Sequence, residues 1–119
     1  MANILLVDDS RTSRKILRNI LESAGHTIVD EATDGEQAIE KYMASKPDVI
    51  TLDITMPVMD GIEALKQIKL VDSEAKVIMV SASSQKDILI EAVKYGAEDF
   101  IAKPFEPSQI ITVLDKLIS

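Results

Sequence analysis

The sequence predicts an α/β fold in which five strands of a parallel sheet alternate with five helices, as a single domain over residues 1–119. Short apolar runs rich in β-branched residues alternate along the chain with amphipathic helical patterns, which is typical of repeated βαβ units. The 119 residues, 46% of them hydrophobic, are also enough for one buried core. No linker, repeat or low-complexity segment interrupts the pattern.

The strands are expected at residues 3–7, 27–32, 48–52, 76–80 and 99–102. After the first strand, Ser10 can cap a helix, and Gly25 is the stop signal of that helix. Pro47 closes the second helix. The apolar faces of these two helices are predicted from helical spacing to contain Ile16, Leu17, Ile20, Leu21 and Ala24 in the first and Ala38, Ile39, Tyr42 and Met43 in the second.

Three more helices complete the alternation. The third begins near Gly61, and the fourth extends from about Ser84 to Gly96. The fifth starts at Pro107, a first-turn position where the missing N–H costs nothing. The inward face of the third helix is expected to consist of Ile62, Leu65 and Ile68.

The composition excludes several classes of protein. Thirteen basic and twenty acidic residues give a net charge of −7, which argues against a nucleic-acid-binding or anionic-membrane surface and favours a protein partner. No cysteine and a single histidine, His26, exclude disulfides, thiolate metal sites and imidazole clusters. The chain shows no signal sequence and no apolar run near the ~18 residues of a membrane span. We therefore expect a cytoplasmic protein without membrane insertion.

Charged and hydroxyl side chains stand where the apolar runs end. The carboxyl ends of parallel strands meet at one edge of a sheet, where ligands bind. Any one of these residues alone is most often a cap, a turn or a solvated charge. Together, three carboxylates at one edge repel one another unless a cation or a proton is present. The set indicates phosphoryl chemistry on Mg²⁺, and its members are Asp8, Asp9, Asp53, Ser81 and Lys103.

Four motifs in this order resemble a known family. They are V-D-D at 7–9, L-D-I-T-M-P-x-M-D-G at 52–61, S-A at 81–82 and F-x-x-K-P-F at 100–105. With them the whole chain resembles the receiver domains of two-component response regulators, and most of all the single-domain, CheY-like chemotaxis regulators. The resemblance implies a flavodoxin-like doubly wound (βα)₅ sheet. It also supplies the strand order 2-1-3-4-5, which the spacing of the runs alone does not give.

The resemblance assigns a role to each residue at the sheet edge. Asp53 would be the phosphoacceptor, forming an acyl phosphate. Asp9, Asp53 and the backbone carbonyl of Thr55 would bind Mg²⁺ directly, with Asp8 acting through water. Lys103 would pair with the transferred phosphoryl group, and the Ser81 hydroxyl would donate a hydrogen bond to it.

Two residues near the end of the fifth strand resemble parts of the family's switch. The resemblance implies a cis peptide between Lys103 and Pro104, although Pro104 could also simply end the strand. Phe100 matches the switch aromatic that follows the movement of Ser81, with an ordinary place in the strand core as the alternative.

The fourth helix is the expected contact for a downstream protein. Ile88, Leu89 and Ile90 are consecutive apolar residues about 100° apart, so one helix face cannot bury all three, and at least one should be partly exposed. In the family, the fourth helix, fifth strand and fifth helix form the signalling face. A target is therefore expected to bind around Leu89, Val93 and Phe100.

These observations together indicate a stand-alone, monomeric response regulator. A histidine kinase would phosphorylate it on Asp53, and chemotaxis is the leading pathway, with a phosphorelay shuttle as the alternative. It is not expected to be an enzyme, apart from a possible role in its own dephosphorylation.

Three other classes of protein were considered. An aspartyl-phosphate phosphohydrolase would need a second Asp at the position of Thr55. A flavin or nucleotide binder is disfavoured by an aromatic content of 3% and by the negative charge of the first turn. A receiver-like protein without phosphorylation is disfavoured because all five site residues are present.

Overall fold

The computed structural model describes residues 1–82 and 86–118, and it has the predicted α/β architecture. The strands β1 to β5 span Asn3–Val7, Thr27–Ala32, Val49–Asp53, Val77–Ala82 and Asp99–Lys103. The helices α1 to α5 span Arg11–Ser23, Gly35–Ser45, Gly61–Val71, Lys86–Lys94 and Pro107–Ile118. All strand pairs are parallel, and the strand order β2-β1-β3-β4-β5 is the one that the resemblance implied.

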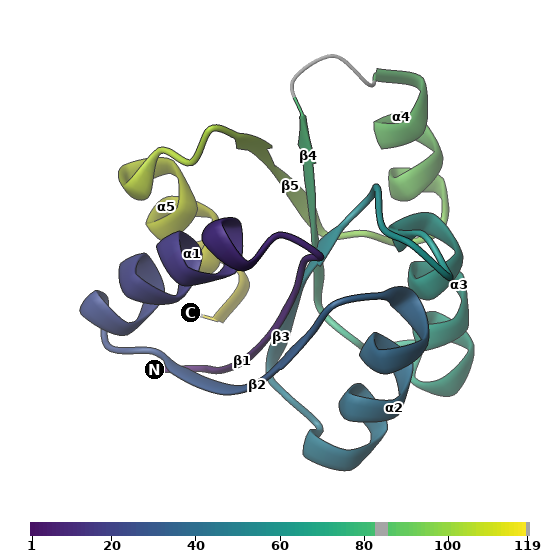
Figure 1. Cartoon of the computed structure of the whole chain (residues 1–119), viewed down its shortest axis with the longest axis horizontal. Helices are drawn as coiled ribbons and strands as arrows, with labels where there is room; N and C mark the ends of the chain where they lie inside the picture. Colours follow the sequence, from purple (N-terminus) through teal and green to yellow (C-terminus); the bar gives the residue numbers. More distant parts are fainter. Residues whose placement is uncertain (83–85, 119) are drawn as a thin grey trace.

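The sheet is covered by helices on both faces. Figure 1 shows α1 and α5 together on one side and α2, α3 and α4 on the other. Successive side chains of a strand point to opposite faces. Accordingly, Ile4 and Leu6 of β1 belong to the core under α1 and α5, whereas Leu5 and Val7 belong to the core under the other three helices. The central strands β1, β3 and β4 are therefore largely buried on both faces, as expected for a parallel sheet, whereas the edge strands β2 and β5 are partly exposed.

Most of the predicted helix signals are confirmed. Ser10 is the N-cap of α1, since its Oγ accepts a hydrogen bond from the Ser13 N–H at 3.2 Å. Gly25 follows that helix with a φ of 92°, the left-handed conformation typical of a helix stop. The helix α5 begins at Pro107. The predicted inward residues of α3, Ile62, Leu65 and Ile68, are all buried.

Asp53, Ser81 and Lys103 belong to their strands rather than following them, whereas Asp8 and Asp9 follow β1 as predicted. The predicted ends at 52, 80 and 102 are too early, because Asp53 pairs with Val80, and Lys103 pairs with Ala82. Strand pairing uses backbone groups, so a polar side chain does not by itself end a strand. The sheet thus extends to Asp53, Ser81 and Lys103 and fixes their backbone.

Three residues predicted for apolar helix faces are exposed, and one of them, Ala24, is the C-cap of α1. Ile16 of α1 is 46% exposed and Met43 of α2 is 55% exposed, whereas the adjacent Leu17 and Tyr42 are buried. Neighbouring residues of a helix point about 100° apart. Each helix therefore buries a narrower stripe than its run of apolar residues suggested.

Two further expectations concern α4 and the membrane. The predicted start of the fourth helix near Ser84 lies outside the described residues. Within residues 1–82 and 86–118, every helix is too short or too polar to cross a bilayer.

Candidate functional site

Three carboxylates meet at the carboxyl edge of the sheet. Asp8 and Asp9 follow β1, and Asp53 is the last residue of the adjacent β3. One oxygen from each carboxylate lies within 4.8 Å of the others. Asp8 and Asp53 are 5% and 6% exposed, whereas Asp9 is open to solvent. The predicted clustering of these residues is therefore present in the fold.

Lys103 supplies a positive charge to this cluster. It is the last residue of β5, and because β4 lies between β3 and β5, its side chain extends across β4. The Lys103 Nζ lies 3.0 Å from Asp8 Oδ2 and 3.5 Å from Asp53 Oδ2. The peptide between Lys103 and Pro104 is cis, as the resemblance implied.

Asp8 has a hydrogen-bond partner at each of its polar groups. Its N–H donates to the Ala32 carbonyl at 3.0 Å, and its Oδ1 accepts from the Ser10 N–H at 2.8 Å. Its carbonyl accepts from Arg14 Nη1 at 2.7 Å, and its Oδ2 faces Lys103. The turn that bears Asp8 and Asp9 is thus held from β2, α1 and β5.

Asp53 and Lys103 bind their protons more tightly than isolated side chains would, because the pKa of each is raised. Burial and the neighbouring Asp8 carboxylate raise the pKa of Asp53 to about 6, and Lys103 opposes this only in part. Burial lowers the pKa of Lys103, but hydrogen bonds and charge attraction from Asp8 and Asp53 raise it by more, so the net change in its pKa is an increase. Three carboxylates and one ammonium leave an excess of negative charge, which adds to the effect of burial on Asp53 and favours the protonated form of Lys103.

The chemistry of these residues fits a divalent cation. Oxygens of three carboxylates, two of which belong to buried residues, converge within reach of a single ion. A charge of +2 would balance the excess negative charge of the cluster. Asp8, Asp9 and Asp53 are the side chains that could hold Mg²⁺. Thr55, whose backbone carbonyl was predicted as a further ligand, lies just beyond Ile54 in the exposed start of the following loop, and that role stays a prediction.

Ser81 lies on the strand between Asp53 and Lys103. It is 3% exposed and directly follows Val80, the residue that pairs with Asp53. This places Ser81 at the same edge of the sheet as the carboxylates. Its predicted hydrogen bond to a phosphoryl group stays a prediction.

Sequence reasoning missed the close contact beneath Asp53. A Cβ atom added to Gly61 would lie 2.0 Å from the Asp53 carbonyl oxygen, and the Gly61 N–H donates to the Ile54 carbonyl at 2.7 Å. From the sequence, Gly61 was predicted only as the start of the third helix. Its further role, which is to let α3 start directly against the end of β3, requires knowledge of which backbone lies beside the glycine.

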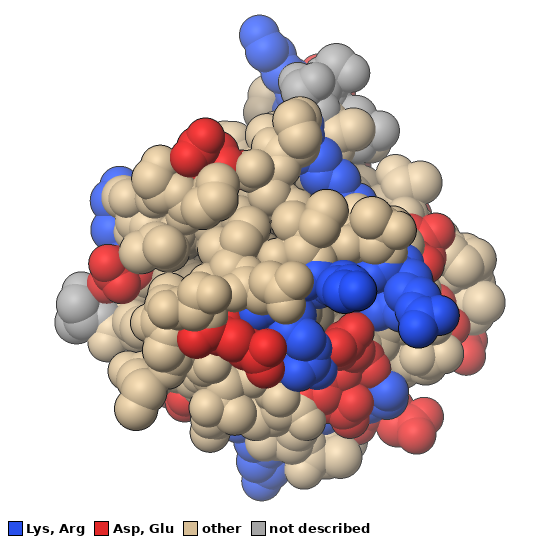
Figure 2. All heavy atoms as spheres, turned by 60° about the vertical axis from the view of Figure 1, so that its left-hand side comes forward, with Lys and Arg blue, Asp and Glu red and all other residues tan. Residues whose placement is uncertain are grey.

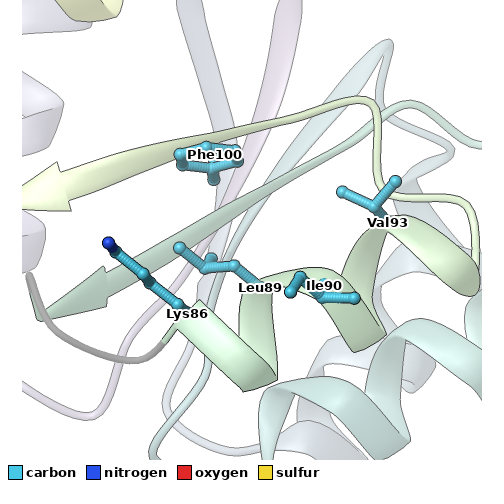
Figure 3. A pocket seen from close by; sticks show the side chains of 5 residues that line it. All are labelled: Lys86, Leu89, Ile90, Val93 and Phe100. Atoms are coloured by element: carbon cyan, nitrogen blue, oxygen red, sulfur yellow. The ribbon is translucent and has the colours of Figure 1, made fainter.

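A second feature is an open groove between α4 and β5, which we call the α4–β5 groove. It has a volume of about 360 Å³ and is lined by Lys86, Leu89, Ile90, Val93 and Phe100. Figure 3 shows Leu89 extending from α4 toward the Phe100 ring on β5. Phe100 is 44% exposed, so the alternative of a place in the strand core is wrong. Ile90 is 69% exposed, which confirms that the 88–90 run cannot be fully buried.

Comparison with known proteins agrees with this geometry. The profile of the response regulator receiver domain matches residues 4–115. The chemotaxis protein CheY of Thermotoga maritima is 48% identical over 96% of this chain and 95% of its own length. CheY of Bacillus subtilis is 46% identical over 98% of this chain and 97% of its own length. Among solved structures, the CheX–CheY–BeF₃–Mg²⁺ complex from Borrelia burgdorferi includes a chain with a TM-score of 0.94 and 39% identity, covering 98% of this chain and 89% of that one.

Proposed function

This chain belongs to the response regulator receiver family, and on that premise we propose that a histidine kinase phosphorylates it on Asp53 and that it passes the signal to a protein target. One observation supports this most directly. The buried Asp53 carboxylate lies within 4.8 Å of two other carboxylates and 3.5 Å from Lys103 Nζ. This arrangement suits a nucleophile that must accept a highly charged group.

In the proposed reaction, an Asp53 carboxylate oxygen attacks the phosphorus of a phosphohistidine. A P–O bond forms, the P–N bond breaks, and the imidazole nitrogen that leaves recovers a proton. Phosphoryl transfer depends mainly on positioning and charge neutralisation, so no general base is needed to activate a carboxylate. Lys103 would neutralise charge on the transferred group, and the Ser81 hydroxyl would donate a hydrogen bond to it.

We propose that Asp9, Asp53 and the Thr55 backbone carbonyl hold Mg²⁺ directly and that Asp8 does so through water. A bound Mg²⁺ would supply the positive charge that balances the phosphoryl oxygens during transfer. The residues fit this task because the cluster has two uncompensated negative charges and keeps Asp9 exposed for access.

The signal is proposed to leave through the α4–β5 groove and the adjoining α5. When the Ser81 hydroxyl moves toward the phosphoryl oxygens, the ring of Phe100 would turn into the space behind it. Such a switch changes the population of two states only by their difference in free energy. Leu89, Val93 and Phe100 line one groove, as a shared binding surface for a target requires.

We propose chemotaxis as the pathway and the cytoplasm as the location, with the protein acting as a monomer. The full-length relatives named above are chemotaxis proteins, which favours this pathway over a phosphorelay. Receiver domains of this type are not enzymes in the ordinary sense. Any help that this chain gives to hydrolysis of its own acyl phosphate is part of the proposal.

The experiment compares wild type, Asp53→Asn and Asp60→Asn after incubation with acetyl phosphate and Mg²⁺. The amide of Asp53→Asn lacks the nucleophilic oxygen but keeps the shape, so we expect its phosphorylation to be abolished. Asp60 is an exposed N-cap of α3, so Asp60→Asn should be phosphorylated as wild type is. Intact mass spectrometry detects the added group. Equal labelling of Asp53→Asn and wild type would refute the assignment.

A further inference from the structure

Arg14 of α1 links the Asp8 backbone at the carboxylate site to Glu31 of β2. It lies in the first turn of that helix, and its side chain is only 15% exposed. Its Nε–H donates to Glu31 Oε1 at 2.8 Å, and its Nη1–H donates to the Asp8 carbonyl at 2.7 Å. Because the guanidinium group is rigid and planar, these two bonds fix the distance and orientation between Glu31 and the Asp8 backbone.

Glu31 is a firm anchor for this link. Its Oε2 accepts from Arg18 Nε at 2.8 Å, and the Lys41 ammonium donates to its backbone carbonyl. Burial raises the pKa of Glu31, but hydrogen bonds and charge attraction from Arg18 and Arg14 lower it by more. The net decrease in pKa favours the ionised carboxylate. Figure 2, which brings the side of α1 and α5 forward, shows basic and acidic side chains lying side by side on this surface.

The contact with Asp8 acts on Asp9 as well. The Asp8 carbonyl and the Asp9 N–H belong to the same planar peptide unit, so a bond that holds the carbonyl also sets the direction of the following backbone. Asp9 is the exposed carboxylate of the cluster. Arg14 therefore acts on the one carboxylate that burial does not hold in place.

A plain stabilising role explains these contacts less well. A basic residue in the first turn of a helix interacts unfavourably with the helix dipole, and a partly exposed ion pair contributes little to stability. An ordinary surface ion pair between Arg14 and Glu31 would not require the second hydrogen bond, which Arg14 donates to the backbone carbonyl of Asp8 beside the carboxylates.

We propose that Arg14 is a positioning residue for the divalent cation: by holding the Asp8–Asp9 peptide against Glu31, it aims the Asp9 carboxylate at the position between Asp8 and Asp53. This inference rests on the proposed function, which places Mg²⁺ among these three residues. It concerns only how the ligands are oriented, since Arg14 touches neither the ion nor the phosphoryl group.

The direction in which the Mg²⁺ dissociation constant changes when Arg14 is replaced distinguishes a positioning role from a purely electrostatic one. Removing a positive charge near an anionic site should by itself strengthen cation binding. Loss of a residue that orients a metal ligand should instead weaken it, by about tenfold or more. Arg14→Ala is therefore expected to raise the dissociation constant for Mg²⁺, although it makes the surroundings more negative.

Arg18→Ala is the matched control. It removes the same charge from the same helix and also breaks a bond to Glu31, but Arg18 does not contact Asp8. We expect it to change the Mg²⁺ dissociation constant by less than about twofold. Arg14→Lys keeps the charge but cannot reproduce the two-pronged geometry, so its dissociation constant should be close to that of Arg14→Ala. This variant also serves if Arg14→Ala does not fold.

The measurement is a Mg²⁺ titration of ¹⁵N-labelled protein followed at the Asp9 and Ser10 amides, with urea unfolding of each metal-free variant. Weaker Mg²⁺ binding in both Arg14 variants, with Arg18→Ala close to wild type, would support the proposal. Equal or tighter binding in the Arg14 variants would overturn it while leaving the metal site intact. Absence of any Mg²⁺ response at these amides in wild type would refute the proposed metal site itself, and the role of Arg14 with it.

Discussion

The carboxylate site and the α4–β5 groove lie at neighbouring parts of one sheet but are built in opposite ways. Lys103 at the end of β5 belongs to the site, whereas Phe100, three residues earlier on the same strand, lines the groove. In the site, Asp8 and Asp53 are buried and lie beside fixed polar groups. In the groove, apolar side chains such as Ile90 and Phe100 remain exposed to water. The site thus holds its polar groups in fixed positions, whereas the groove retains exposed apolar surface that a partner could bury.

The two helices beside these regions differ in the same way. The helix α3, which starts beneath Asp53, buries five residues, including Leu65 and Ile68. Among the described residues of α4, only Ala92 is fully buried. Substitutions near the site should therefore affect folding strongly, whereas substitutions in the groove should affect folding little.

The largest expected effect is that of Gly61→Ala. The new methyl group would collide with the Asp53 carbonyl and break the bond from the Gly61 N–H to Ile54, costing about 4 kcal/mol or more. Urea unfolding measures the loss. Gly96→Ala, after α4, is the control: its methyl group would meet the flexible end of Lys69, so only the left-handed backbone, about 1 to 2 kcal/mol, opposes it. Equal losses would contradict the difference between the two regions.

The next effect is in the core under α3. Leu65 is completely buried, so Leu65→Ala should lower the free energy of unfolding by about 3 kcal/mol through lost burial and a cavity. Leu89→Ala in α4 is the matched substitution at a half-buried position, and we expect a loss of about 1 kcal/mol. Urea unfolding of both variants measures the difference. A loss for Leu89→Ala as large as that for Leu65→Ala would show that α4 is as firmly packed as α3.

The third effect is the pH dependence of the site without metal. The pKa of Asp53 is raised to about 6 in the folded protein, against about 4 in an unfolded chain, so the folded state binds more protons between these values. Ionisation of Asp53 therefore costs stability, by up to about 3 kcal/mol, as the pH rises through this interval.

We expect the stability of wild type relative to Asp53→Asn to fall between about pH 4 and pH 7 in the presence of a chelator. The difference between the two proteins cancels the contribution of other groups, such as Glu31, whose lowered pKa acts in the opposite direction. A constant difference between wild type and Asp53→Asn would mean that the Asp53 charge is already compensated in the metal-free protein.

The smallest effect is expected in the groove. Ile90 is 69% exposed, so Ile90→Ser should change the free energy of unfolding by less than about 0.5 kcal/mol. Thermal unfolding at constant pH measures this change. Ile101→Ser, one residue from Phe100 but fully buried, is the contrasting variant and should be strongly destabilised. A loss of more than about 2 kcal/mol for Ile90→Ser would show that the groove stabilises the fold.

Much of this molecule could be predicted because the relevant signals are local. The β-branched runs, the Ser10 cap and the Gly25 stop act within a few residues, so element types and order follow from the sequence. The meeting of Asp8, Asp9, Asp53 and Lys103 also follows, since carboxyl ends of parallel strands share one edge. The strand order and the cis peptide before Pro104 came from resemblance to a family.

Tertiary structure alone decided features that depend on contacts between distant segments. Ile16 and Met43 have helical spacing but face solvent, because the width of the buried stripe depends on how each helix lies on the sheet. The raised pKa of Asp53 requires its actual burial and its distance from Asp8. Arg14 bonds to both Glu31 and the Asp8 carbonyl because β2 lies beside β1. The sequence determines which groups reach the site, and the packing of β1, β2 and α1 decides how they are held there.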